Sequence, residues 1–137
     1  MKGSGEMNYA DLRKYDASNW SGINTTLFVS SFNYGKPFTK EVEDLLIAYA
    51  KDEFVDGVCI LGGEPLQQDF DTMFNLVKRI KAEVDKPIQM WSSCTWEEIL
   101  QDDKKVNILL WIDTLVDGQR KIDVQRSLLE GRMIEIC

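Results

Sequence analysis

Short apolar runs alternate with amphipathic stretches along this chain. Runs rich in β-branched residues predict buried strands at residues 25–30 (TTLFVS), 58–61 (VCIL), 87–91 (PIQMW) and 112–116 (IDTLV). Apolar residues that recur at helical spacing predict helices at residues 39–51, capped by Thr39, and at about residues 69–84. Residues 32–38 are expected to form a loop, because Gly35 and Pro37 interrupt both periodicities.

The C-terminal third contains several turn and cap signals. Thr95 and Glu98 have the spacing of a capping box, so a short helix should begin at Thr95. Residues 102–105 (DDKK) are expected to be an exposed connector. Asp117-Gly118 lies between strand 112–116 and a possible strand at 119–123, and such a dipeptide predicts a hairpin with antiparallel strands. A helical turn through about residue 128 and an apolar segment, 133–136, should follow.

Strands and helices alternate in order, which favours an α/β fold with a mainly parallel sheet. The length of 137 residues suits a single domain over residues 1–137, with residues 1–7 as a flexible N-terminus. The hydrophobic fraction of 44% is sufficient for a real core.

Charge and composition exclude several classes of function. A net charge of −7 makes the chain a poor candidate for binding nucleic acid, and the absence of a long apolar run argues against a membrane span. The N-terminus has no apolar signal segment, so a cytoplasmic location is the default expectation. The sequence contains no histidine, which removes catalysis by Ser-His or Cys-His pairs.

The three cysteines, Cys59, Cys94 and Cys137, are too far apart in sequence to form a metal-binding motif. They are therefore interpreted as free thiols, with Cys59 packed inside a core strand. The residues of the chain predict no metal ligand.

Gly62, Gly63, Glu64 and Pro65 follow the predicted strand 58–61, at the end of the strand where α/β folds bind ligands. Exposed carbonyls beside a carboxylate would form an acceptor-rich site that suits an ammonium group. The competing interpretation is a sharp turn that needs glycine for its backbone angles.

Longer sequence motifs elsewhere in the chain favour the ligand-binding interpretation over the simple turn. The chain resembles the activating proteins of anaerobic ribonucleoside-triphosphate reductase, which belong to the radical S-adenosylmethionine (SAM) family. The blocks that carry the resemblance lie in the family's order and are Asn19 and Gly22, residues 25–30, 32–39 (FNYGKPFT), 61–65 (LGGEP), Trp91, 95–98 (TWEE), 112–118 (IDTLVDG) and 119–128 (QRKIDVQRSL).

The resemblance implies a partial (β/α) barrel with helices outside, and an enzyme that uses SAM and a 4Fe–4S cluster to generate a glycyl radical on the reductase. It also implies two partners, the large reductase subunit and an electron donor such as a flavodoxin. By the same resemblance Gly62, Gly63 and Glu64 hold the amino group of SAM. The remaining expected SAM contacts are Pro65, Trp91, Ser92, Cys94 and Asp117; no catalytic residue is assigned.

The chain departs from the family at two junctions. The CxxxCxxC cluster loop is expected between Ser31 and Phe32 but is absent, and a family segment is absent between Gly118 and Gln119. Ser92 and Ser93 replace threonine and glycine, and Cys94 replaces tyrosine. Either the chain lacks both loops, or these 137 residues join segments that a longer natural chain separates.

Two other functions follow from different interpretations of the same residues. A relative without the cluster could bind the reductase or SAM without chemistry. An unrelated nucleotide-binding domain would instead have helices on both faces of an open sheet, but the chain contains neither a GxGxxG nor a P-loop sequence.

Overall fold

The computed structural model describes residues 7–30 and 34–136. The strands are β1 Asn8–Asp16, β2 Asn24–Val29, β3 Lys36–Pro37, β4 Gly57–Gly62, β5 Ile88–Ser92, β6 Thr114–Asp117 and β7 Arg120–Asp123. The helices are α1 Lys40–Ala50, α2 Phe70–Glu83, α3 Trp96–Ile99, α4 Asp103–Leu109 and α5 Val124–Glu130, together with a 3₁₀ turn, η1, at Pro65–Gln67. None of the described helices is long and apolar enough to cross a bilayer.

The described strands form one sheet in the order β3-β1-β2-β4-β5-β6-β7. The three central pairs, from β2 to β6, are parallel, whereas the pairs at both ends of the sheet are antiparallel. The α/β class is confirmed, but the sheet is mixed and not mainly parallel. A barrel is not confirmed, because β3 and β7 lie at opposite ends of the strand order.

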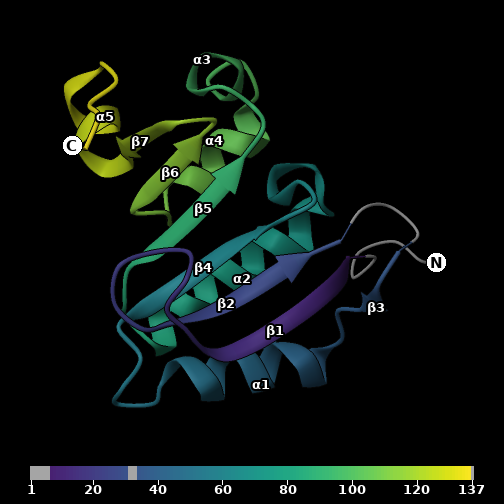
Figure 1. Ribbon diagram of the computed structural model, residues 1–137. Coiled ribbons are helices and arrows are strands. Elements are labelled where there is room, and N and C mark those ends of the chain that lie inside the picture. Colours follow the sequence, from purple (N-terminus) through teal and green to yellow (C-terminus); the bar gives the residue numbers. More distant parts are fainter. Residues whose placement is uncertain (1–6, 31–33, 137) are drawn as a thin grey trace.

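The helices α1, α2 and α4 cover one face of the sheet (Figure 1). Contacts join α1 to β1 and β2, α1 to α2, and α2 to α4, so the three helices lie in sequence along that face. This one-sided arrangement does not match the two-sided arrangement expected of an unrelated nucleotide-binding domain.

The pairing of residues between neighbouring strands shows which core side chains share a face of the sheet. Leu27, Ile60, Met90 and Leu115 are paired across four strands and are all fully buried. Their burial stabilises the fold by roughly 1.5–3 kcal/mol per side chain. Because side chains alternate along a strand, the preceding residues form a buried row on the opposite face: Thr26, Cys59, Gln89 and Thr114.

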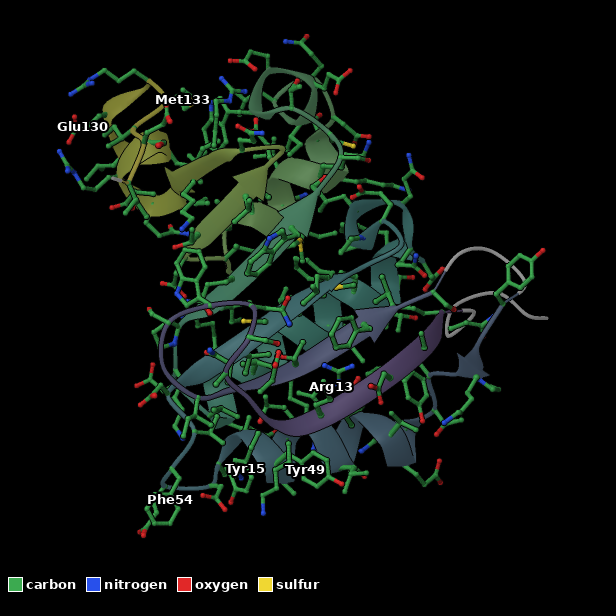
Figure 2. The ribbon with its side chains drawn as sticks, viewed as in Figure 1. Arg13, Tyr15, Tyr49, Phe54, Glu130 and Met133 are labelled. Atoms are coloured by element: carbon green, nitrogen blue, oxygen red, sulfur yellow. The ribbon has the colours of Figure 1, made fainter. Side chains whose placement is uncertain are left out.

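The end of β1 is anchored to the C-terminal end of α1 and the turn that follows. The Tyr15 hydroxyl donates to Asp52 at 2.7 Å, and the Lys14 ammonium lies over the rings of Tyr15 and Tyr49 at 5.1 and 5.8 Å. Figure 2 shows both tyrosines beside α1. The Asp52 pKa falls to about 2, because the Phe54 backbone N–H and the Tyr15 hydroxyl donate to its carboxylate.

Most of the predicted elements are confirmed within one or two residues. Thr39 caps α1, Asp69 caps α2, and the capping box of Thr95 and Glu98 has both of its hydrogen bonds. The predicted hairpin is confirmed as well, since β6 and β7 pair antiparallel around a turn at Gly118 and Gln119. A two-residue turn therefore joins the two strands at this junction in the structure.

Other expectations need correction. The predicted connector 102–105 begins α4, because Asp102 accepts from the backbone N–H groups of Lys104 and Lys105. The strand β1 was not predicted at all, since its sequence NYADLRKYD alternates only weakly between apolar and polar. Met7 belongs to the core, with none of its surface exposed, although it was assigned to a flexible N-terminus. Residues 1–6 and the Ser31–Phe32 junction lie outside the described residues.

Candidate functional site

A cavity of about 250 Å³ lies at the carboxyl ends of β4, β5 and β6. Parallel strands place their carboxyl ends at one edge of a sheet, and this edge is where α/β folds bind ligands. Figure 1 shows the arrowheads of β2, β5 and β6 pointing toward that edge. The cavity is lined by Gly62, Gly63, Trp91, Ser92, Ser93, Val116 and Gly118.

Gly62 is required by the backbone geometry of this edge. Its φ of +107° is unfavourable for a side chain, and an added Cβ would lie 2.4 Å from the Val29 carbonyl oxygen. Gly63 donates its N–H to the same carbonyl at 3.0 Å. The turn interpretation of the glycines therefore holds, and the same turn also lines the cavity.

The carboxylate of Glu64 is buried and accepts four hydrogen bonds from its own chain. The Leu66 N–H at 3.0 Å and the Ser92 hydroxyl at 2.8 Å donate to Oε2. The Ser93 N–H at 2.6 Å and the Ser93 hydroxyl at 2.7 Å donate to Oε1. A carboxylate offers about four acceptor positions, so protein donors fill this one completely.

Glu64, Pro65 and Cys94 do not line the cavity, although all three were expected to contact the ligand. Pro65 is buried as the first residue of η1. Cys94 is half-buried; its N–H donates to the Ser92 hydroxyl at 2.9 Å, and its Sγ lies 3.7 Å from the Lys105 ammonium.

Two tryptophans meet on the face of the sheet opposite the helices. Trp91 lines the cavity, and Trp20, from the connection between β1 and β2, packs edge-on against it with ring centroids 5.7 Å apart. The Lys121 ammonium lies 5.1 Å from the centre of the Trp20 ring. The connection between β1 and β2 thus covers part of this face. Trp96, in contrast, packs in the core.

Asp117 ends β6 beside the cavity, but its side chain is only 2% exposed. It accepts from the Trp96 N–H at 2.7 Å and from Arg120 at 2.9 and 2.5 Å. Arg120 also pairs with Glu97 at 2.9 Å and lowers the pKa of that carboxyl. These contacts give Asp117 a structural role: it joins the β6–β7 hairpin to α3. Gly118, and not Asp117, lines the cavity.

Two buried polar side chains, Asp16 and Cys59, lie deeper in the face of the sheet that carries Trp91. Burial disfavours the ionised form of Asp16, but hydrogen bonds from Ser18, Asn19 and Thr26 outweigh it and hold the Asp16 pKa well below its usual range. Burial, followed by the nearby Asp16 charge, raises the pKa of the Cys59 thiol to about 12. Cys59 is therefore a packed, unreactive thiol, as predicted.

The described residues do not fit a 4Fe–4S cluster. Such a cluster is held mainly by cysteine thiolates, and Cys59 and Cys94 are the two cysteines in the described part of the chain. One is enclosed in β4, and within residues 7–30 and 34–136 no three acidic or cysteine side chains gather to hold a metal ion. Cys137 and the expected cluster position after Ser31 lie outside the described residues.

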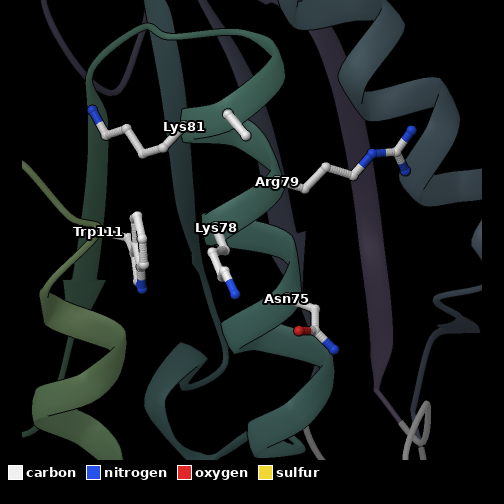
Figure 3. Close-up of a pocket in the computed structure, with 6 residues that line it drawn as sticks. Asn75, Lys78, Arg79, Lys81 and Trp111 are labelled. Carbon is white, nitrogen blue, oxygen red and sulfur yellow. The ribbon is translucent and has the colours of Figure 1, made fainter.

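A second pocket, of about 410 Å³, lies on the helix-covered side between α2 and Trp111 (Figure 3). Two of its lining cations pair with carboxylates, because Arg79 binds Glu43, Asp44 and Glu83, and Lys81 binds Asp113. The Lys78 ammonium lies 5.6 Å from the centre of the Phe74 ring. This pocket shares no lining residue with the cavity at the strand edge, so the two are separate. Asp113 also accepts from the Ile88 N–H at the start of β5 at 2.8 Å.

Comparisons with known proteins agree with the family resemblance that the sequence motifs indicated. A family model described as a 4Fe-4S single cluster domain matches residues 16–133. The anaerobic ribonucleoside-triphosphate reductase-activating protein of Vibrio cholerae is 34% identical over 132 positions, covering 82% of this chain and 84% of that protein. The chain belongs to the family of these activating proteins.

Further members of the family match over similar spans. The proteins of the same name from Pasteurella multocida and Escherichia coli K12 are both 32% identical, and the alignments cover 86% and 93% of those proteins. No solved structure gives a significant match. The Vibrio cholerae alignment has 132 positions but includes 82% of these 137 residues, about 112, so about 20 aligned positions have no residue here.

Three residues of the site were not assigned from the sequence. Ser93 was noted only as a replacement for glycine, although a hydroxyl near the predicted Glu64 site was a usable signal. Arg120 and Trp20 reach the site through the hairpin and through the connection between β1 and β2. The contact of Trp20 with Trp91 joins residues far apart in the sequence, so local sequence does not reveal it. Arg120 lies three residues from Asp117 across the hairpin turn, a spacing that the predicted hairpin could have indicated.

Proposed function

We propose that this protein activates an anaerobic ribonucleoside-triphosphate reductase in the cytoplasm, with the large reductase subunit as its partner. The observation that carries the proposal is identity of 32–34% to activating proteins over 84–93% of their length in the Vibrio cholerae and Escherichia coli comparisons. The match to a 4Fe-4S domain model also favours an enzyme over a relative that only binds.

The proposed chemistry is SAM-dependent formation of a glycyl radical on the reductase, with a flavodoxin-type protein as electron donor. The cavity beside Gly62 and Gly63 is the proposed SAM site. Its position at the carboxyl ends of the parallel strands supports this assignment, as does the presence of Trp91 and Ser92 in its lining.

We infer that the cluster cysteines belong to a segment between Ser31 and Phe32 that these 137 residues do not include. About 20 positions of the Vibrio cholerae alignment have no residue in this chain, which is enough for such a segment. The geometry of β2 supports it too, because Val29 pairs with Gly62 and its carbonyl accepts from Gly63. A segment that leaves β2 after Ser30 would begin directly beside the proposed SAM site.

Intact-mass spectrometry of the natural protein, followed by anaerobic reconstitution with iron and sulfide, tests this proposal. We expect a mass above 15.8 kDa, visible absorption from a cluster, and 5′-deoxyadenosine after addition of SAM and reductant. A natural protein of 15.8 kDa that forms neither cluster nor 5′-deoxyadenosine would refute the enzymatic function.

A further inference from the structure

The Glu64 carboxylate reaches four donors on two separate segments of the chain. Leu66 belongs to the turn after β4, whereas Ser92 is the last residue of β5 and Ser93 follows it. An ammonium group has three donors and no acceptor, so it can bind this carboxylate only at an oxygen position that another donor has left.

The four donors differ in how easily they can leave. The Leu66 N–H is fixed in η1, and Leu66 is buried, so its displacement would leave a buried donor unpaired. The Ser92 hydroxyl is buried and is itself held by the Cys94 N–H at 2.9 Å. Ser93 is exposed and lines the cavity, so its hydroxyl can rotate into water at little cost.

We propose that the Ser93 hydroxyl is a latch: it occupies the Glu64 oxygen that a ligand ammonium needs, and so lowers the affinity of this edge for SAM. This inference rests on the proposed function, which supplies SAM as the ligand. The ammonium group displaces the Ser93 hydroxyl from Oε1, while the other three donors keep the carboxylate in place.

Asp117, the other carboxylate at this edge of the sheet, supports the assignment of the ammonium site to Glu64. Asp117 is nearly fully buried and already paired with Arg120 and the Trp96 N–H. It offers no exposed oxygen to a cation. Among the carboxylates at the ends of β4 and β6, Glu64 is thus the one with an exposed, rotatable donor.

The test is isothermal titration of the natural protein with SAM and with 5′-methylthioadenosine, which has the adenosyl group but no ammonium. Ser93→Ala should bind SAM about fivefold more tightly than the unsubstituted protein and 5′-methylthioadenosine equally well. Ser93→Thr, which keeps a hydroxyl, should have the original SAM affinity. Ser21→Ala, at an exposed serine outside the cavity lining, is the matched control.

Thermal unfolding without ligand provides a second readout. Ser93→Ala should lower the Tm, because the Glu64 carboxylate loses a donor, while its SAM affinity rises; a purely structural role for Ser93 would lower both. Equal SAM affinities of Ser93→Ala and the unsubstituted protein would overturn the latch and leave the proposed function standing. Absence of SAM binding in every variant would overturn both.

Discussion

The guanidinium of Arg120 binds both oxygens of Asp117, with Nε 2.9 Å from Oδ1 and Nη2 2.5 Å from Oδ2. The two residues flank the turn between β6 and β7, and Asp117 is almost entirely buried. This pair therefore compensates a carboxylate that water does not reach.

Arg120→Ala should destabilise the protein by about 2–3 kcal/mol, because it leaves the buried Asp117 charge without its cation. Urea unfolding monitored by circular dichroism measures this difference. Arg132→Ala is the control, since Arg132 is 68% exposed and pairs with Glu130 at the surface. Its effect should stay within about 0.5 kcal/mol. Equal effects of the two substitutions would contradict a role for the buried pair.

Gly62→Ala should destabilise the protein by about 3 kcal/mol or more, because the added Cβ meets the Val29 carbonyl oxygen in a backbone conformation that already disfavours side chains. Gly131→Ala is a matched control: its φ is +70°, but no atom lies within 4 Å of the added Cβ. That control should cost about 1 kcal/mol. If chemical denaturation gave the same loss for both, the close approach of β4 to β2 would not be important for stability.

Asp16 should make stability depend on pH in the acid range. Because hydrogen bonds depress its pKa in the folded protein, Asp16 stabilises the fold fully above its ordinary pKa of 3.8. That stabilisation is lost as the pH falls further toward the folded value. Asp16→Asn should therefore lose about 2 kcal/mol at pH 7, and the difference should shrink between about pH 4 and pH 2. A difference independent of pH would show that the charge of Asp16 is unimportant.

Cys59 should resist alkylation in the native protein. Burial and the neighbouring Asp16 raise its pKa to about 12, so little thiolate forms at pH 8. Iodoacetamide labelling followed by peptide mass mapping should modify the half-buried Cys94 first and Cys59 only after unfolding. Labelling of Cys59 at the rate of Cys94 would contradict the buried position of β4.

Local sequence signals predicted the parts of the fold that depend on neighbouring residues. Thr39 and Thr95 begin their helices as predicted, because a cap acts within four residues of the chain. The strand β1 was missed because its position depends on pairing with β2 and not on its own weak periodicity. The mixed sheet follows from the same omission, since β1 adds two antiparallel pairs.

The candidate site was predicted in part for a similar reason. Gly62, Gly63, Trp91 and Ser92 meet at the cavity because they follow parallel strands, which sequence order can indicate. The hydrogen bonds that fill the Glu64 carboxylate depend on Ser93, which lies 29 residues away in the sequence, so only tertiary structure brings this donor into contact. Arg120 meets Asp117 across the hairpin turn, three residues away.

Electron paramagnetic resonance of the large reductase subunit tests the central claim most directly. The subunit is incubated anaerobically with the natural, cluster-reconstituted protein, SAM and reductant. We predict a glycyl-radical signal that requires SAM and is strongly reduced by Glu64→Ala, which removes the carboxylate proposed to hold the SAM ammonium. No radical signal from a protein that carries the cluster and binds SAM would contradict the assignment as a reductase activator.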